Sequence, residues 1–312
     1  MAKKLKPETE NKNIRPLDMN GLSGRMLYLP APKNKKKHIL LLYGHHASIE
    51  RMYGIAESLN TYGSVTLPDL PGFGGMDSFY SIGMKPSIDT MADYVASFIK
   101  LRFRGKRITI VGMSLGFAIV TRMLQRYPEL VKKVDLLISL VGLSHYQDIV
   151  FKKPRVIMYK SLAEIFSFRI TAALFHSIIL SPVAIRTAYA KTHNAKNKLV
   201  HLSEVERKRA IEFEVKLWRS EDTRTYMRMT LAMLRLDNCN KQVDLPVEHV
   251  SIKDDQYFDH STVEQHMRII FTDFNEHVAV LPHHAPSVIA DKSEAKPFIP
   301  KSIKKVLRKN SV

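Results

Sequence analysis

The chain of 312 residues is long enough for one large domain or two smaller ones. Its composition, 45% hydrophobic and 25% charged, is close to the average of soluble globular proteins, which excludes disordered and fibrous classes. The only cysteine, Cys239, excludes an intramolecular disulfide framework and a zinc site built from a cysteine cluster. The formal net charge of +18 is unusual, and it bears on solubility and polyanionic partners rather than on fold.

The basic residues gather in three parts of the chain: residues 1–37, 145–245 and 292–312. The remaining residues carry slightly more acidic than basic side chains. No known nucleic-acid-binding motif and no basic strand interleaved with aromatic residues accompanies the charge. We therefore expect no specific nucleic-acid partner.

The N-terminal residues contain no apolar stretch of the length that a secretory signal needs, which predicts a cytoplasmic protein. The longest apolar region, residues 165–185, contains Arg169 and His176 and is broken by Pro182. This region falls short of the roughly 20 uninterrupted apolar residues that cross a bilayer. We interpret it as buried or interfacial helix.

Short apolar segments alternate with helical patterns between residues 38 and 143. The apolar segments are typical of strands buried on both faces, whereas spacings of three and four between apolar residues predict helices. Strict alternation of the two predicts a mostly parallel α/β sheet with helices on both faces. We expect strands at 38–43, 64–67, 107–112 and 134–141, and helices at 49–59, 88–103 and 115–127.

Residues 144–243 are helical in pattern throughout, and the alternation then resumes with strands at 247–252 and 277–281 around a helix at 261–270. An all-helical insertion within one sheet is the simplest interpretation. The domain plan is a basic N-terminal segment (1–24), an α/β core (25–143 and 246–291), a helical cap (144–245) and a basic C-terminal tail (292–312). We expect the tail to form a loosely attached amphipathic helix.

The sequence Gly112-Met113-Ser114-Leu115-Gly116 follows a predicted strand and opens a predicted helix. This is the setting in which a nucleophilic serine is exposed on a tight strand-to-helix turn. Small residues at 112 and 116 allow the strand and the helix to approach closely. Free N–H groups at the start of the helix favour developing negative charge beside Ser114.

A nucleophilic serine needs a base, and the base needs an orienting acid. Among the 13 histidines we favour His284, in the loop after the last predicted strand, with its neighbour His283 as the alternative. For the acid we favour Asp255, which follows the strand at 247–252. Asp254 and Asp148 are its alternatives, and each of the favoured residues comes just past a strand.

Two other classes of site receive little support. The pairs His45-His46 and His283-His284 could converge at one edge of the sheet, but no carboxylate has a characteristic zinc-ligand spacing to them. No G-x-G-x-x-G sequence follows the first strand, which disfavours a dinucleotide fold. We expect neither a metal nor a cofactor.

Together these motifs resemble the α/β-hydrolase superfamily over about residues 25–291. The matches are the elbow GMSLG, the turn Leu42-Tyr43-Gly44-His45, the run Asp69-Leu70-Pro71-Gly72-Phe73-Gly74, and the sequence His284-Ala285-Pro286. The resemblance implies a triad of Ser114, Asp255 and His284, and an oxyanion hole formed by the N–H of Leu115 and that of His45 or His46. Tyr43 and His283 stand where this superfamily usually has histidine and glycine.

The resemblance predicts a serine hydrolase that acts on a small or lipid-like acyl ester. The alternative is a non-catalytic binding module that uses its basic ends to hold an acidic partner or a membrane surface. A basic, helix-rich cap could also rest on an anionic membrane as a peripheral protein. The sequence does not determine the oligomeric state, or the choice among ester, amide, lactone, thioester and carbon–carbon bond.

Overall fold

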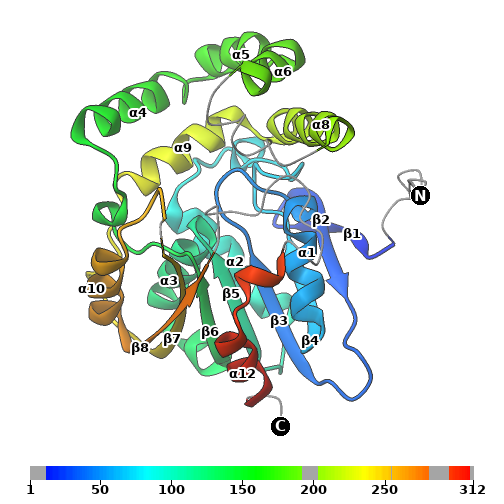
Figure 1. Cartoon of the computed structure of the whole chain (residues 1–312), viewed down its shortest axis with the longest axis vertical. Coiled ribbons are helices and arrows are strands. Elements are labelled where there is room, and N and C mark those ends of the chain that lie inside the picture. Colours follow the sequence, from blue (N-terminus) through cyan, green and yellow to red (C-terminus); the bar gives the residue numbers. More distant parts are fainter. Residues whose placement is uncertain (1–11, 192–202, 254, 281–294, 310–312) are drawn as a thin grey trace.

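The computed structural model describes residues 12–191, 203–253, 255–280 and 295–309. Eight strands form one sheet in the order β1-β2-β4-β3-β5-β6-β7-β8, and the strands from β4 to β8 are parallel (Figure 1). The predicted α/β class with a mostly parallel sheet is therefore confirmed. The strands are β1 (Ile14–Met19), β2 (Leu22–Leu29), β3 (Lys37–Leu42), β4 (Gly63–Pro68), β5 (Ile108–Met113), β6 (Val134–Leu140), β7 (Val243–Ile252) and β8 (Phe271–Ala279).

Helices cover both faces of the sheet. The helix α1 lies on one face with the C-terminal α12, and α2 and α3 pack against each other on the other face (Figure 1). Ser87 begins α2 with a capping box, in which its side chain accepts from the Thr90 N–H. The core helices are α1 (Ile49–Asn60), α2 (Ile88–Arg102), α3 (Leu115–Arg126), α10 (His260–Ile270) and α12 (Lys301–Lys309).

The sheet begins earlier than the strand patterns indicated, inside residues 1–24. The strands β1 and β2 form an antiparallel hairpin whose turn is Asn20-Gly21. Both turn residues have positive φ, 54° and 78°, as a two-residue hairpin turn requires. Only one end of β1 is buried, so its apolar pattern is too weak to predict a strand. The Asn-Gly pair was the sequence feature that could have predicted this hairpin.

The segment between β6 and β7 is helical, as predicted, and stands over the carboxyl edge of the sheet (Figure 1). The helices α4 and α5 both contact α9, which lies between them and the core, and α6 packs on α8. These cap helices are α4 (Lys153–Ile165), α5 (Arg169–Ile178), α6 (Pro182–Lys191), α8 (Glu204–Ser220) and α9 (Thr223–Met233). Short 3-10 turns are η1 (Phe79–Ile82), η2 (Pro128–Lys133), η3 (Tyr146–Asp148) and η4 (Lys296–Phe298).

The C-terminal helix α12 corrects one expectation. It is amphipathic, as predicted, but it is not loosely attached, because Ile303 and Leu307 are buried in the main hydrophobic core. The Lys37 ammonium also donates a 2.8 Å hydrogen bond to the Leu307 carbonyl. The many charged residues of this segment suggested an exposed helix and gave no indication that one of its faces is buried in the core.

Candidate active site

Ser114 stands at the sharp turn between β5 and α3. Its backbone has φ 49° and ψ −120°, a strained combination for a residue with a side chain. The Ser114 N–H donates to the Leu140 carbonyl at 3.0 Å, which fixes the turn to the neighbouring strand β6. The N–H of Leu115 follows at the first position of α3, where a helix provides no intrahelical acceptor.

Glycines around this turn are required by close approach of the backbone. A Cβ atom on Gly116 would lie 2.4 Å from the Tyr43 carbonyl oxygen, and one on Gly44 would lie 2.9 Å from the Ser114 Cβ. A side chain fits at neither position without movement of backbone. The loop after β3 and the elbow are therefore in contact, which brings the His45 backbone beside Ser114.

Ser114 lines a cavity of about 630 Å³ between the core and the cap. Its volume is in the range of small-molecule sites. Apolar and aromatic side chains dominate the lining, and most of them come from the cap. The lining residues beside Ser114 include Ile149, Phe151, Tyr159, Leu162, Ala163, Phe166, Phe175, Trp218, Tyr226, Met227, Met233, Leu234, Ile252, Tyr257 and Phe258.

The predicted acid, Asp255, lies in the turn after β7. Its Oδ1 atom accepts from the N–H groups of Tyr257 at 2.8 Å and Phe258 at 3.3 Å. Both of these residues line the cavity that Ser114 enters. The predicted base His284 and the alternatives His283 and Asp254 lie outside the described residues, so the triad stays a prediction.

Asp148, the other candidate acid, is engaged elsewhere. It is completely buried and lies 2.5 Å from His266 Nδ1 on α10. Its second oxygen accepts from the N–H groups of Ser144 and His145 at 2.7 and 2.9 Å. These contacts give Asp148 a role in holding the start of the cap.

His45 joins the loop after β3 to the cap helix α9. Its Nε2 atom lies 3.1 Å from the Tyr226 carbonyl, and because a carbonyl only accepts, Nε2 carries the proton. Burial lowers the pKa of His45 to about 4, against the opposing effect of the Tyr226 hydrogen bond. The ring is therefore neutral near pH 7.

His46 is held between two cap carboxylates. Its Nδ1 atom lies 2.8 Å from Glu221 Oε2, and its Nε2 atom lies 3.1 Å from Glu214 Oε2. Burial alone would lower the pKa of His46, but the Glu221 charge and the hydrogen bonds to both carboxylates raise it. Since ionised carboxylates only accept, two such bonds require a doubly protonated imidazolium.

Arg51, on α1, completes this buried cluster through an ion pair with Glu214. Burial alone would raise the pKa of Glu214, but the His46 hydrogen bond and the Arg51 charge lower it to about 2. Two cations thus face two carboxylates between the core and α8. Sequence reasoning placed His46 near the site but missed its partners, because nothing in the local pattern links residues so far apart.

Tyr43, which stands where the resembled superfamily usually has histidine, links two loops. Its hydroxyl donates to Asp69 Oδ1 at 3.0 Å and accepts from the Leu70 N–H at 2.7 Å. Both Tyr43 and Asp69 are completely buried. The tyrosine therefore connects the turn before Gly44 to the loop that contains Asp69 and Leu70.

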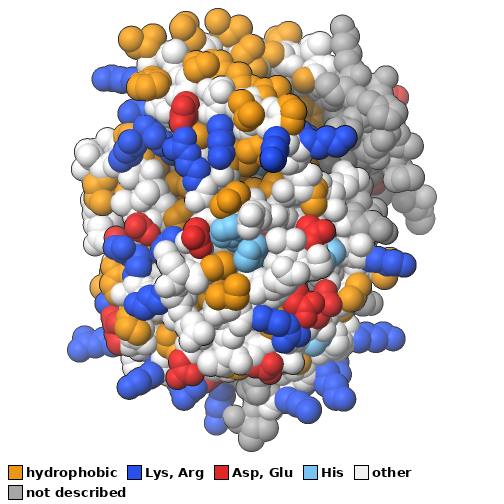
Figure 2. Space-filling view, turned by 90° about the vertical axis from the view of Figure 1, so that its left-hand side faces the viewer, with side chains coloured by type: hydrophobic (Ala, Val, Ile, Leu, Met, Phe, Trp, Pro, Cys, Tyr) orange, Lys and Arg blue, Asp and Glu red, His pale blue; other side chains and the backbone are white. Residues whose placement is uncertain are grey.

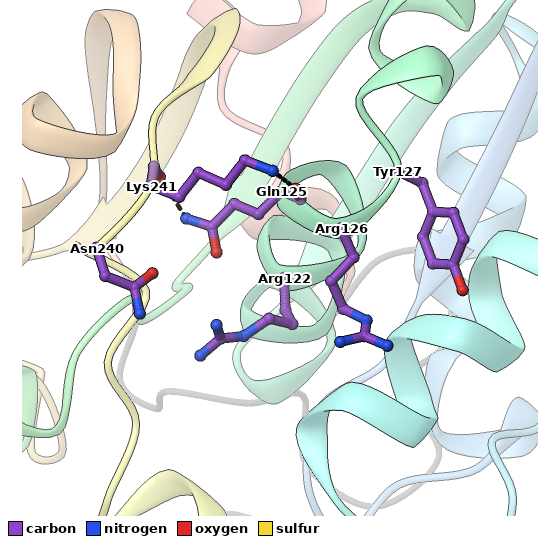
Figure 3. Close-up of a pocket in the computed structure, with 6 residues that line it drawn as sticks. All are labelled: Arg122, Gln125, Arg126, Tyr127, Asn240 and Lys241. Atoms are coloured by element: carbon purple, nitrogen blue, oxygen red, sulfur yellow. Dashed lines mark hydrogen bonds between the residues drawn. The ribbon is translucent and has the colours of Figure 1, made fainter.

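No group of three or more potential ligands is arranged for a metal ion among the residues that the structure describes. A hollow of about 380 Å³ at the far end of α3 lies away from Ser114 and is lined by Arg122, Gln125, Arg126, Tyr127, Asn240 and Lys241 (Figure 3). Arg126 pairs with Asp93 at 2.9 Å, and Lys241 donates to the Gln125 carbonyl. The hollow contains none of the predicted site residues.

Comparisons with known proteins agree with this architecture. Residues 37–153 match a family model described as alpha/beta hydrolase fold, and no curated protein sequence matches the chain significantly. A putative lipase from Acinetobacter baumannii AYE superposes with a TM-score of 0.66 at 16% identity, covering 95% of this chain and 92% of the other.

Two further solved structures show the same likeness. A thermophilic esterase from Thermogutta terrifontis has a TM-score of 0.61 at 15% identity, covering 96% and 98% of the two chains. A deformylase from Pseudomonas putida S16 has a TM-score of 0.62 at 15% identity, covering 88% and 96%. The chain therefore has the α/β-hydrolase fold, and the resemblance seen in its sequence motifs is confirmed.

Proposed function

We propose that this protein is a serine hydrolase that cleaves carboxylic esters with an apolar acyl group. The observation that carries the proposal is Ser114, held on a strained elbow and opening into a largely apolar cavity. Strain of this kind is retained where the surrounding structure enforces it, and it is concentrated at functional sites. The fold shared with an esterase and a lipase supports the same reaction class.

In the proposed mechanism, Ser114 Oγ attacks the ester carbonyl while His284 accepts the hydroxyl proton and Asp255 stabilises the imidazolium. The N–H groups of Leu115 and His45, or His46, stabilise the negative oxygen of the tetrahedral intermediate. His284 returns the proton to the leaving alcohol, which leaves an acyl-Ser114. Water, deprotonated by His284, then releases the acid and restores the serine.

The cavity supports an apolar substrate rather than a small polar one. Phe166, Phe175 and Met227 line it from three different cap helices or their ends. An acyl chain in this space would remove apolar surface from water on both partners, at roughly 25 cal/mol per Å². Among the fold neighbours is also a deformylase, so amide substrates belong in the test.

A fluorophosphonate probe tests the nucleophile directly. We expect the wild-type protein and the control Ser81→Ala to be labelled, and Ser114→Ala to remain unlabelled although folded by circular dichroism. Ser81 is an exposed serine outside the cavity, which makes it a matched control. Absence of labelling in folded wild-type protein would contradict the proposal and favour the non-catalytic binding module.

A series of p-nitrophenyl esters of graded chain length, with matched anilides, tests the substrate class. We expect kcat/KM to rise with acyl length beyond acetate, and esters to be cleaved faster than the anilides. A preference for acetate, or for the anilides, would overturn the assignment of an apolar ester while leaving Ser114 as nucleophile.

A further inference from the structure

The outer face of the cap carries an unusual number of exposed apolar side chains. Ile170 is 76% exposed and Val183 is 71% exposed, although both lie on helices. Figure 2 shows hydrophobic side chains gathered over the cap, with a row of Lys and Arg side chains beneath them. The members of this apolar face are Ile157, Met158, Leu162, Ile165, Phe168, Ile170, Leu174, Ile178, Ile179 and Val183.

Helical spacing makes this surface continuous along α5. Ile170, Leu174 and Ile178 recur every four residues, so they form one stripe along α5. Ala172, on the opposite side of the same helix, is 3% exposed. Three of the larger apolar residues of this helix therefore face solvent, whereas Phe175 faces the Ser114 cavity. A soluble domain usually buries such an apolar stripe.

A basic hollow of about 230 Å³ lies at the base of this face, between the turn after η1 and the start of α5. Four cationic side chains line it: Lys85, Arg169, Arg224 and Arg228. None of its lining residues is acidic, and within the described ranges none of the four cations forms an ion pair. Uncompensated cations around one hollow favour an anionic ligand.

The geometry of the two arginines from α9 suits an anion. Arg224 and Arg228 are four residues apart and so lie on the same side of α9. The Arg224 guanidinium rests 3.4 Å from the centre of the Tyr80 ring, which fixes its plane. The Nε atoms of both arginines are buried and have no hydrogen-bond partner among the described residues.

The hollow and the apolar face meet at one residue. Phe168 lines the hollow and is also 65% exposed on the outer face. A ligand that fills both must therefore combine an anionic group with apolar chains at adjacent positions. A phospholipid bilayer presents this combination across its interface.

We propose that the apolar face of the cap docks on a bilayer that contains anionic phospholipid, with a headgroup phosphate bound in the basic hollow. The stripe on α5 enters the acyl boundary, and Arg224 and Arg228 hold the phosphate. Between residues 152 and 189, basic side chains outnumber the single acidic one, Glu164, which is itself paired with Arg235. This charge suits an anionic membrane better than a second, equally basic copy of the chain.

Spanning is not required by this arrangement. No single helix among the described residues is long and apolar enough to cross a membrane; only the bent pair Arg169–Ile178 and Pro182–Tyr189, at 62°, has sufficient combined length and composition. Leu162 belongs both to the apolar face and to the lining of the Ser114 cavity. Docking thus places that side of the cavity at the bilayer. The docking proposal does not depend on the proposed function, but the delivery of a membrane substrate to Ser114 does.

Co-sedimentation of the full chain with phosphatidylcholine vesicles, with and without phosphatidylserine, tests the proposal. We expect binding to the mixed vesicles and its loss in the variant Ile170→Ser/Leu174→Ser/Ile178→Ser. The control Leu101→Ser replaces a side chain that is 69% exposed on α2, and it should bind as the wild type does. Ser114→Ala should also bind normally, which separates this proposal from the catalytic one.

The second arm tests the hollow. We expect Arg224→Gln/Arg228→Gln to weaken partitioning into the mixed vesicles on the order of 30-fold, since each basic residue near an anionic surface contributes about a factor of five. The exposed pair Arg104→Gln/Lys106→Gln is the matched control and should change partitioning much less. Thermal unfolding of each variant verifies that it folds.

Three outcomes would overturn the proposal. One is absence of vesicle binding by folded wild-type protein at low salt. Another is stabilisation by inorganic phosphate without vesicle binding, which would assign the hollow to a free phosphate. The third is a wild-type dimer in light scattering that the α5 triple variant dissociates, which would assign the apolar face to a second copy.

Discussion

The imidazole of His46 and the carboxylate of Glu221 lie 2.8 Å apart although 175 residues separate them in the chain. With Glu214 and Arg51 they connect the loop beside Ser114 to the cap helix α8. All three of these partners are less than 10% exposed. These charged groups are therefore shielded from water and stabilised by ion pairs with one another. Removing one partner would leave a buried charge uncompensated.

Replacement of His46 by asparagine should lower the free energy of unfolding by about 3 kcal/mol, because both carboxylates then lose a charged donor. Asparagine tolerates the positive φ of this position, 57°, so backbone strain adds little. Urea denaturation measures the change. The exposed ion pair of Lys208 with Glu204 supplies the control Lys208→Gln, which should have no measurable effect. A loss below about 1 kcal/mol in His46→Asn would contradict this account of the cluster.

The stability that His46 contributes should depend on pH. Its pKa in the folded state is raised above 6.5, so the folded protein takes up the proton more readily than the unfolded chain. The contribution is complete below pH 6.5 and is lost as the pH rises through the folded-state pKa. Urea unfolding of the wild type and His46→Asn from about pH 6 to about pH 9 measures it. Their difference in stability should shrink across this range, and a constant or growing difference would contradict the assignment.

The contact of the elbow with the loop after β3 predicts that Gly116→Ala destabilises the protein by about 2 to 3 kcal/mol. The new methyl group would lie 2.4 Å from the Tyr43 carbonyl oxygen, which cannot retreat without moving β3. Gly105→Ala is the control, since its φ is positive but no atom lies within 4 Å of the added Cβ. That variant should lose only about 1 kcal/mol, from backbone strain. Equal losses in chemical denaturation would show that close approach is not the constraint at residue 116.

Burial of α12 predicts that the C-terminal helix contributes to global stability. Leu307→Ala should lower the free energy of unfolding by about 2 to 4 kcal/mol, because the side chain is completely buried and leaves a cavity. Lys305→Ala, on the exposed side of the same helix, should leave the midpoint of urea denaturation unchanged. If the two variants behave alike, the helix is only loosely attached after all.

Enlarging Leu162 tests how the cavity limits the acyl group. Leu162 is 42% exposed and lines the cavity, so a tryptophan at this position can be accommodated while it reduces the space left for a long acyl chain. In Leu162→Trp we expect kcat/KM for long-chain p-nitrophenyl esters to fall about tenfold relative to kcat/KM for the acetate. The esters are assayed at concentrations at which they do not form micelles. Leu101→Trp, on α2, is the control for a new exposed indole. A uniform fall for all chain lengths would mean that this part of the cavity wall does not select substrates.

The order of most core strands and helices, and the position of the elbow, could be predicted from the amino-acid sequence. The run Ile108–Met113 is buried on both faces, so its continuous apolar pattern indicates a parallel strand without knowledge of its neighbours. Gly112 likewise marks a local steric need, because a Cβ there would lie 2.7 Å from the Phe117 Cα five residues further along the chain. These features depend on the chemistry of residues close together in the chain, where periodicity and turn chemistry are informative.

Which charged and apolar groups find a partner could not be predicted from the sequence, because it depends on how the helices and strands pack. The apolar positions of α5 and α12 follow similar helical patterns, yet the structure covers Leu307 completely and leaves Leu174 55% exposed. His46 meets Glu214 and Glu221 only because the cap folds back over the sheet. Burial of a helix face and pairing of distant charges depend on how whole helices and strands pack together. A local sequence pattern does not contain that information.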